Sequence, residues 1–340
     1  MSRVLVTGAG GFIGHHLVTY LKRNGYWVRG ADLKRPEYEP SIADEFAELD
    51  LRRWENCLNV TSGIDEVYAL AADMGGMGFI STNHARILHN NALMNLHTLE
   101  ASRTNKVKRY FYSSSACVYP EYLQTSEDVT PLKEENAYPA APQDAYGWEK
   151  LLAERLCLHY RDDYGMETRI VRFHNIFGPL GTWDGGREKA PAALCRKVAV
   201  AKATGQDEIE VWGDGQQTRS FCYVDDCITG IYKLMRSDYR EPLNLGQDRL
   251  VTIDQLADMV AEAAGIRIAK KHTPGPQGVR GRNSDNTRLR EVLGWSPEIS
   301  LEVGLARTYE WIEQEVIRSL KTERVDGNAP ARDRPVPHVM

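Results

Sequence analysis

The sequence predicts an α/β protein in which a doubly wound parallel sheet forms the larger part and a smaller α/β unit forms the rest. Short apolar strand patterns alternate with amphipathic helical patterns along the first half of the chain. Such alternation is typical of parallel βαβ units, because two parallel strands need a crossover helix between them. The chain has 340 residues, which is long for one hydrophobic core and favours two domains.

The early elements follow one another at short intervals. Val4–Val6 is a short apolar run, typical of a buried strand, and Ile13, Leu17 and Leu21 lie on one face of the helix that follows. The predicted elements are strand 4–6, helix 11–21, strand 27–31, strand 66–70, helix 90–103, strand 108–113 and strand 169–173.

The composition of the sequence changes after about Gly178. Loops rich in Gly, Pro and Trp appear, with helical patterns at 253–264 and 301–320. The stretch 224–235 again resembles a strand end that leads into a helix, so we expect it to return to the first domain. We predict a first domain at 1–177 plus about 221–246, a second at 178–220 plus about 247–320, and a flexible tail at 321–340, which lacks apolar periodicity.

The bulk properties narrow the class of protein. A net charge of −5 gives no basic face for nucleic acid. No apolar run is long enough to span a bilayer, and the first residues lead straight into a strand pattern instead of a targeting peptide. The six cysteines form no CxxC pair and no Cys/His cluster at zinc spacing. We therefore expect a cytoplasmic protein in a reducing compartment, with no structural metal.

A glycine motif stands between the first predicted strand and the first predicted helix. Gly8, Gly11 and Gly14 have the GxxGxxG spacing of a dinucleotide-binding turn. Gly8 would permit the tight turn, Gly11 would let the backbone approach a pyrophosphate, and Gly14 would let the helix lie close to the strand. This placement predicts a Rossmann-type domain, with Phe12 and Ile13 also at the cofactor.

Two acidic residues follow the motif at positions that suit the cofactor. Asp32 closes the second strand, where a carboxylate accepts from the adenosine ribose hydroxyls, and this favours NAD over NADP. Lys34 and Arg35 follow at once and keep NADP open, because a nearby cation can hold a 2′-phosphate. Asp50 is either at the adenine edge or a plain turn residue.

Tyr146 and Lys150 are four residues apart, and Asp144 is a plausible N-cap for the helix that would carry them. A free tyrosine has a pKa of about 10 and is a poor base at neutral pH. A neighbouring lysine and the positive nicotinamide ring would lower the pKa of Tyr146. Ser115, after another strand, could hydrogen-bond the reacting oxygen. Together these features resemble the extended short-chain dehydrogenase/reductase family along nearly the whole chain.

A second acid/base pair has two open interpretations. Cys117 stands two residues after Ser115, and Lys189 lies in a Gly-rich loop. A thiol and an amine on opposite faces of a sugar ring could remove and return a proton on carbon, once a ketone at C4 acidifies C3 and C5. The alternative is a buried cysteine that packs as a small hydrophobe and a merely solvated lysine.

Several longer motifs narrow the resemblance to the GDP-mannose 3,5-epimerase family. The motifs are Ala72–Met77, Phe173–Pro179, Gly181–Trp183, Arg187–Pro191, Trp212–Ser220 and Gly275–Asn286. The segment between Arg196 and Trp212 and the tail after Leu320 depart from that family.

The resemblance implies a role for each matching position. Cys117 and Lys189 would be the acid/base pair at C5 and C3, and Tyr146 with Lys150 would serve C4 and contact NAD. Arg219 and Arg282 offer bidentate donors to a diphosphate. Substrate contacts would fall on Gly75, Ser115, Ala116, Cys117, Asn175, Glu188, Lys189, Ala190, Lys197, Gln217, Arg219 and Arg282.

The implied activity is conversion of GDP-D-mannose to GDP-L-galactose, with GDP-L-gulose from inversion at C5 alone, by a homodimer that needs NAD. Two related activities stay open, a GDP-mannose 4,6-dehydratase and a UDP-sugar 4-epimerase. A dehydratase is expected to have an acid near the position of Cys117, and none is obvious here. A non-enzymatic NAD-binding scaffold is the remaining alternative, although it would need none of the four acid/base residues.

Overall fold

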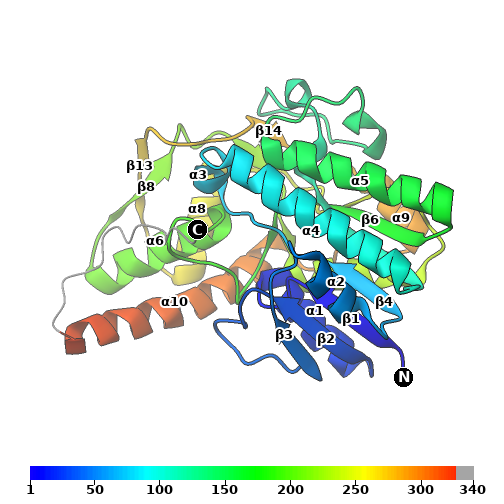
Figure 1. Ribbon diagram of the computed structural model, residues 1–340. Coiled ribbons are helices and arrows are strands. Elements are labelled where there is room, and N and C mark those ends of the chain that lie inside the picture. Colours follow the sequence, from blue (N-terminus) through cyan, green and yellow to red (C-terminus); the bar gives the residue numbers. More distant parts are fainter. Residues whose placement is uncertain (327–340) are drawn as a thin grey trace.

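The computed structural model describes residues 1–326, and a seven-stranded sheet lies at its centre (Figure 1). The strand order is β11-β6-β5-β4-β1-β2-β3, and every neighbouring pair is parallel. The order reverses beside β1, which makes the sheet doubly wound, as predicted. The strands are β1 (Arg3–Thr7), β2 (Trp27–Asp32), β3 (Glu45–Glu48), β4 (Glu66–Ala69), β5 (Arg109–Ser115), β6 (Glu167–Phe173) and β11 (Leu243–Leu245).

Helices cover both faces of this sheet, and β1 shows why. Val4 and Val6 point into one hydrophobic cluster and Leu5 into another, so both faces of the strand are buried. The first cluster also receives α1 (Phe12–Arg23) and α7 (Val224–Arg236). The second receives α2 (Trp54–Thr61), α4 (His84–Thr104) and α5 (Ala145–Tyr164), which lie together in Figure 1.

The remaining elements form the smaller α/β part. Helices α6 (Ala190–Thr204), α8 (Ile253–Ala264) and α10 (Leu301–Asp326) pack together. The short strands are β7 (Ile176–Phe177), β8 (Glu208–Trp212), β9 (Thr218–Arg219), β10 (Cys222–Tyr223), β12 (Val251–Thr252), β13 (Ala269–Thr273) and β14 (Gly281–Arg282). The short helices are α3 (Met77–Ile80), η1 (Ala116–Val118), η2 (Glu121–Leu123), η3 (Glu134–Ala137) and α9 (Thr287–Leu293).

The predicted fold class is confirmed. Helix α10 runs on to Asp326, past Leu320, where the sequence predicts the start of a flexible tail. Lys, Thr, Glu and Arg continue a helix without apolar periodicity, because several of them are good helix formers. The rest of that predicted tail, 327–340, lies outside the described residues. The domain boundaries stay a prediction, although one hydrophobic cluster extends from Val4 to Val316.

Within the described part of the chain, every helix is too short or too polar to cross a membrane.

A buried ion pair ties the sheet to the elements above its carboxyl edge. Arg172 of β6 donates from Nε and Nη2 to both carboxylate oxygens of Glu154 on α5, at 2.9 and 2.7 Å. Both side chains are about as buried as any in the protein, at 2% and 1% exposure. Ser114 at the end of β5 also donates to Glu154. Nη1 of Arg172 donates to the Glu134 carbonyl at 2.7 Å and to the Tyr119 hydroxyl at 3.3 Å. One guanidinium therefore joins β5, α5, β6 and two loops.

We expect Glu154→Gln to lower the free energy of unfolding by about 3–5 kcal/mol, because it leaves the Arg172 charge buried without its counter-ion. Urea denaturation followed by circular dichroism measures the change. The matched control is Glu302→Gln, which removes a half-exposed ion pair with Arg249 and should cost less than about 1 kcal/mol. Equal losses in the two variants would contradict the importance of the buried pair.

Candidate active site

The glycine motif forms a tight turn whose open side faces a cleft. Gly8 has a φ of +72°, in the left-handed region that favours glycine, and a Cβ on Gly14 would lie 2.0 Å from the Gly8 carbonyl oxygen. Gly11 is the N-cap of α1, and no side chain caps the helix there. The backbone N–H groups in the first turn of α1 and the dipole of the helix favour a phosphate at this end. The cleft beside them is lined by Gly10, Gly11, Phe12, His15, Lys34, Pro36, Glu37, Tyr38, Glu39, Leu180 and Thr182.

The carboxylate of Asp32 lies at the end of β2, as predicted. Its Oδ2 accepts from the Gly10 backbone N–H at 3.0 Å, and burial raises the pKa of this carboxyl. The two cations that kept NADP open already have acidic partners, since Lys34 lies 3.1 Å from Glu37 and Arg35 lies 3.8 Å from Glu48. The turn, the uncapped helix and Asp32 thus fit a dinucleotide, with Phe12 and Ile13 behind them in the first turn of α1.

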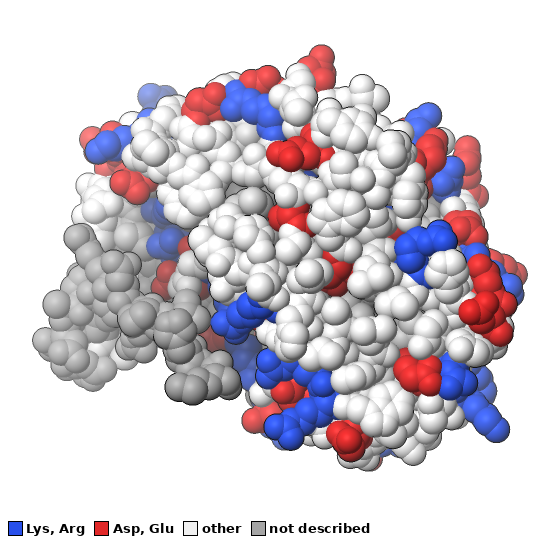
Figure 2. Space-filling view, turned by 45° about the horizontal axis from the view of Figure 1, so that its top comes forward, with Lys and Arg blue, Asp and Glu red and all other residues white. Residues whose placement is uncertain are grey.

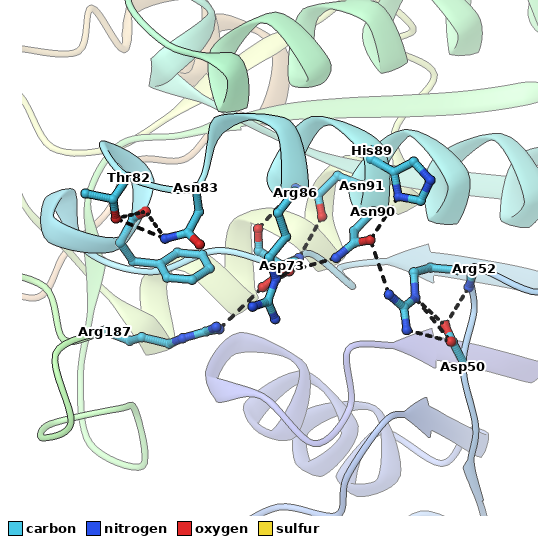
Figure 3. Close-up of polar contacts among 11 residues, drawn as sticks. Asp50, Arg52, Asp73, Thr82, Asn83, Arg86, His89, Asn90, Asn91 and Arg187 are labelled. Carbon is cyan, nitrogen blue, oxygen red and sulfur yellow. Dashed lines mark hydrogen bonds and ion pairs between the residues drawn. The ribbon is translucent and has the colours of Figure 1, made fainter. Parts of the chain in front are cut away.

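Asp50 belongs to a polar cluster with Arg52 and Asn90 (Figure 3). The Arg52 side chain donates to both carboxylate oxygens of Asp50, at 2.8–3.1 Å, and the Arg52 backbone N–H donates at 2.9 Å. These contacts lower the pKa of Asp50. They match the turn-residue interpretation, and a role at the adenine edge stays a prediction.

Helix α5 begins as the sequence predicts. The Asp144 side chain accepts from the Gly147 N–H at 2.8 Å and caps the helix. Tyr146 and Lys150 therefore occupy successive turns of one face, and the Lys150 ammonium lies 5.5 Å from the centre of the Tyr146 ring. Lys150 also donates to the Ser113 carbonyl at 2.9 Å, which ties the helix to the end of β5.

The protein without NAD does not show the lowering of the Tyr146 pKa that is expected from Lys150 together with the nicotinamide ring. Burial raises the pKa of Tyr146, the Cys117 thiol adds to the rise, and a hydrogen bond with Ser115 opposes it. Burial also lowers the pKa of Lys150, and the Glu149 carboxylate opposes this change. The loss of hydration thus outweighs the lysine charge that the sequence argument relied on.

Cys117 faces the site from η1, directly after β5. Its backbone N–H donates to the Ser115 hydroxyl at 3.2 Å, and its sulfur accepts from Nη1 of Arg282 at 3.4 Å. Its carbonyl lies against the start of α5, where a Cβ on Gly147 would come within 2.2 Å of it. Cys117 is half-buried and packs against the hydrophobic cluster that contains Tyr146, so both interpretations of this cysteine stay open.

Lys189 is the N-cap residue of α6, in a segment that includes the left-handed Gly185 and Gly186. Lys189 is exposed, and desolvation by the groups around its amine lowers the pKa of that amine. Cys117 is a near neighbour of this amine, of Tyr146, of Lys150 and of Arg219. The four predicted acid/base residues therefore converge on one region.

Two arginines lie side by side near the Cys117 thiol. Arg219 and Arg282 are direct neighbours on the paired strands β9 and β14. Burial and the charge of Arg282 lower the pKa of Arg219 to about 9. Like charges on neighbouring strand positions repel, so this pair favours an anion. Nearby, Gln217 donates to the Trp212 carbonyl at 3.0 Å, while its buried Oε1 has no partner.

Several of the other predicted substrate residues already hydrogen-bond to groups of the protein. Asn175, with a left-handed φ of 46°, donates to the Ser220 carbonyl at 2.8 Å. Lys197 donates to the Glu210 carbonyl at 2.7 Å, which weakens the case for it. Glu188 accepts from the Gly186 N–H and from Arg196. Gly75, Ala116 and Ala190 lie in the segments that carry Asp73, Cys117 and Lys189.

Sequence reasoning missed several residues that hold the site. Gln124 accepts from Nε of Arg282, and Glu149 accepts from Asn91 and Asn95 at 2.9 and 3.0 Å beside Lys150. No local pattern marks these contacts, because their partners are far away in the sequence. The acidic residue directly before Lys150 is the one signal in the sequence that could have found Glu149.

Comparison with known proteins agrees with this geometry. The family model described as "NAD dependent epimerase/dehydratase family" matches residues 4–246. The chain is 52% identical over 316 residues to the GDP-mannose 3,5-epimerase of Arabidopsis thaliana, covering 92% of this chain and 83% of the relative. It is 51% identical over 326 residues to GDP-mannose 3,5-epimerase 1 of Oryza sativa subsp. japonica, covering 95% and 85%.

A solved structure of similar shape contains the cofactor. UDP-glucuronic acid 4-epimerase from Bacillus cereus, in complex with UDP-glucuronic acid and NAD, superposes with a TM-score of 0.78 at 26% identity, over 92% of this chain and 99% of that one. The glycine turn and Asp32 fit the same group, so NAD is the cofactor. The chain belongs to the NAD dependent epimerase/dehydratase family and, within it, to the GDP-mannose 3,5-epimerases.

Proposed function

We propose that the protein converts GDP-D-mannose to GDP-L-galactose, with GDP-L-gulose as the product when only C5 inverts. The observation that supports this proposal is the packing of Cys117 against Tyr146, beside which Lys150 lies 5.5 Å from the ring centre, with the Lys189 amine near the thiol. A simple 4-epimerase needs only Tyr146 and Lys150. The names of the rice and Arabidopsis relatives support the same substrate.

The residues divide the chemistry between them. Tyr146 accepts the proton of the C4 hydroxyl and later returns it, while Lys150 holds the helix against β5 and supplies positive charge. NAD, when bound, supplies reversible oxidation at C4, which makes the C–H bonds at C3 and C5 acidic. One member of the Cys117/Lys189 pair removes a proton from carbon, and the other returns one to the opposite face. Protons and electrons balance, so no net redox product forms.

Two features suit these residues to their roles. Burial lowers the pKa of Lys189, which increases the neutral fraction of amine that can accept a proton. Arg282 donates to the Cys117 sulfur at 3.4 Å, which holds the thiol in a defined orientation. Arg219 and Arg282 would bind an anionic part of the substrate, which for a nucleotide sugar is its diphosphate.

We also propose a homodimer formed through α4 and α5. Leu88 and Leu96 on α4 and Trp148 and Leu152 on α5 are 40–49% exposed although they are large and apolar. The side of the molecule seen in Figure 2 has a broad uncharged area, with most charged side chains around its edge. A second copy of the same helix pair would cover such a surface.

A cytoplasmic location is part of the proposal. All six cysteines are free thiols and five of them are buried, which suits a reducing compartment.

Turnover of GDP-mannose in deuterated water, followed by NMR, is the direct test of the activity. We expect GDP-L-galactose with deuterium at C5 and C3, because both positions exchange through the acid/base pair. A 4-keto-6-deoxy sugar would replace the proposal with a dehydratase. Inversion at C4 without solvent deuterium would replace it with a 4-epimerase, and absence of any turnover would favour a scaffold.

We expect Cys117→Ser to slow deuterium incorporation at C3 and C5 by about 10²-fold or more, since a hydroxyl is a much weaker acid than a thiol. Substrate affinity, measured by calorimetry, should change little. The matched control is Cys57→Ser. Cys57 lies on α2, and its thiol is buried in the hydrophobic core outside the site. Normal exchange in Cys117→Ser would remove the thiol from the mechanism.

We expect Leu152→Glu to convert the protein to a monomer, because it places a charge in the apolar α4/α5 surface. Light scattering at the assay concentration measures the mass, and Glu302→Gln on the far helix α10 is the control. A wild-type protein that is already monomeric would contradict the proposed dimer.

A further inference from the structure

We propose that Asp73 and Arg187 are positioning residues that hold Lys189 in its working place. The inference depends on the proposed function, because it assigns a cause to the position of one of the two proton carriers. Neither residue reaches the site as an acid or base. Instead, their contact joins the segment after β4 to the segment that leads into α6, and Lys189 is the N-cap of that helix.

Contacts with helix α4 hold Asp73 in place independently of Arg187 (Figure 3). Its Oδ2 accepts from Nε of Arg86 and from Nδ2 of Asn90, both at 3.0 Å and both from α4. Its backbone N–H donates to Oδ1 of Asn91 at 2.7 Å. The side chain is 15% exposed, so water competes weakly for it. The carboxylate is therefore a rigid anchor, with Oδ1 left for Arg187.

Arg187 docks on this anchor at three points. Its Nη1 lies 3.4 Å from Oδ1 of Asp73, and its guanidinium stacks 3.9 Å from the centre of the Phe79 ring. Its carbonyl accepts from the Gly76 N–H at 2.9 Å. The approach is so close that a Cβ on Gly76 would lie 2.4 Å from the Glu188 carbonyl oxygen. The main chain two residues before Lys189 is thus held from one side.

A second set of contacts holds the same segment. Arg196 of α6 donates from Nη2 to Glu188 at 3.0 Å, and its Nε lies 3.5 Å from Asp184. Lys189 therefore follows a segment that is held both by Asp73 and by Arg196. This support matters because Gly185 and Gly186, both with left-handed φ, give the loop little stiffness of its own.

The anchoring affects catalysis through geometry. A lysine amine has four rotatable bonds, and a loosened main chain adds to its spread of positions. A misplacement of about 1 Å in a reacting group can cost on the order of 10²-fold in rate. The contact of Arg187 with Asp73 would therefore influence kcat, although neither side chain exchanges a proton.

The experiment is a double-mutant cycle between Arg187 and Lys189, read as kcat and as deuterium incorporation from solvent. We expect Arg187→Gln to lower both by about 10- to 100-fold with a smaller change in KM, and Arg187→Lys to recover part of the loss. In a Lys189→Met background, Arg187→Gln should have no further effect on the residual exchange, because its action passes through Lys189. Circular dichroism checks that each variant is folded.

Arg249→Gln is the control. It removes a half-exposed ion pair with Glu302 that has no part in this anchor, so its kcat should stay within about twofold of the wild type. Equal losses in Arg249→Gln and Arg187→Gln would overturn the inference, as would full additivity with Lys189→Met. If Lys189→Met itself kept full activity, the proposed role of Lys189 would fail together with the inference. A normal Arg187→Gln beside an inactive Lys189→Met would overturn the inference alone.

Discussion

The buried pair between Glu154 and Arg172 is the interaction on which the site depends. The sheet contributes Arg172 and Ser114 to this cluster and helix α5 contributes Glu154, and both charged side chains are almost fully shielded from water. The connection reaches further, because the Tyr119 hydroxyl that contacts Arg172 also donates to Asn244 of β11. The distances between Tyr146, Lys150 and Cys117 thus follow from a charge pair that none of them touches.

The two acid/base pairs also share a support on their other side. Asn91 contacts the backbone of Asp73 and donates to Glu149, which lies 3.9 Å from the Lys150 ammonium. A side chain of α4 therefore connects the anchor of the Lys189 loop with the helix that carries Tyr146. This arrangement explains how residues from distant parts of the sequence can act on one sugar ring.

The sequence was a good guide wherever the cause is local. The left-handed Gly8, the close approach at Gly14 and the Asp144 cap each follow from a few neighbouring residues. The convergence of Cys117 and Lys189 came from family resemblance, because their spacing alone left the packed and solvated alternatives open. The contacts of Asp73 with Arg187 and of Asp50 with Arg52 were not predicted. The raised pKa of Tyr146 in the protein without NAD was not predicted, because its main cause is burial, which a sequence does not show.

Gly147 has a consequence for attempts to redesign this catalyst. The carbonyl of Cys117 occupies the space that any side chain at this position would need. In a directed-evolution library that varies the first turn of α5, any substitution of Gly147 would displace Cys117 and remove the variant from selection. Engineering toward other hexoses is therefore better confined to β9 and β14, with the junction of η1 and α5 kept constant.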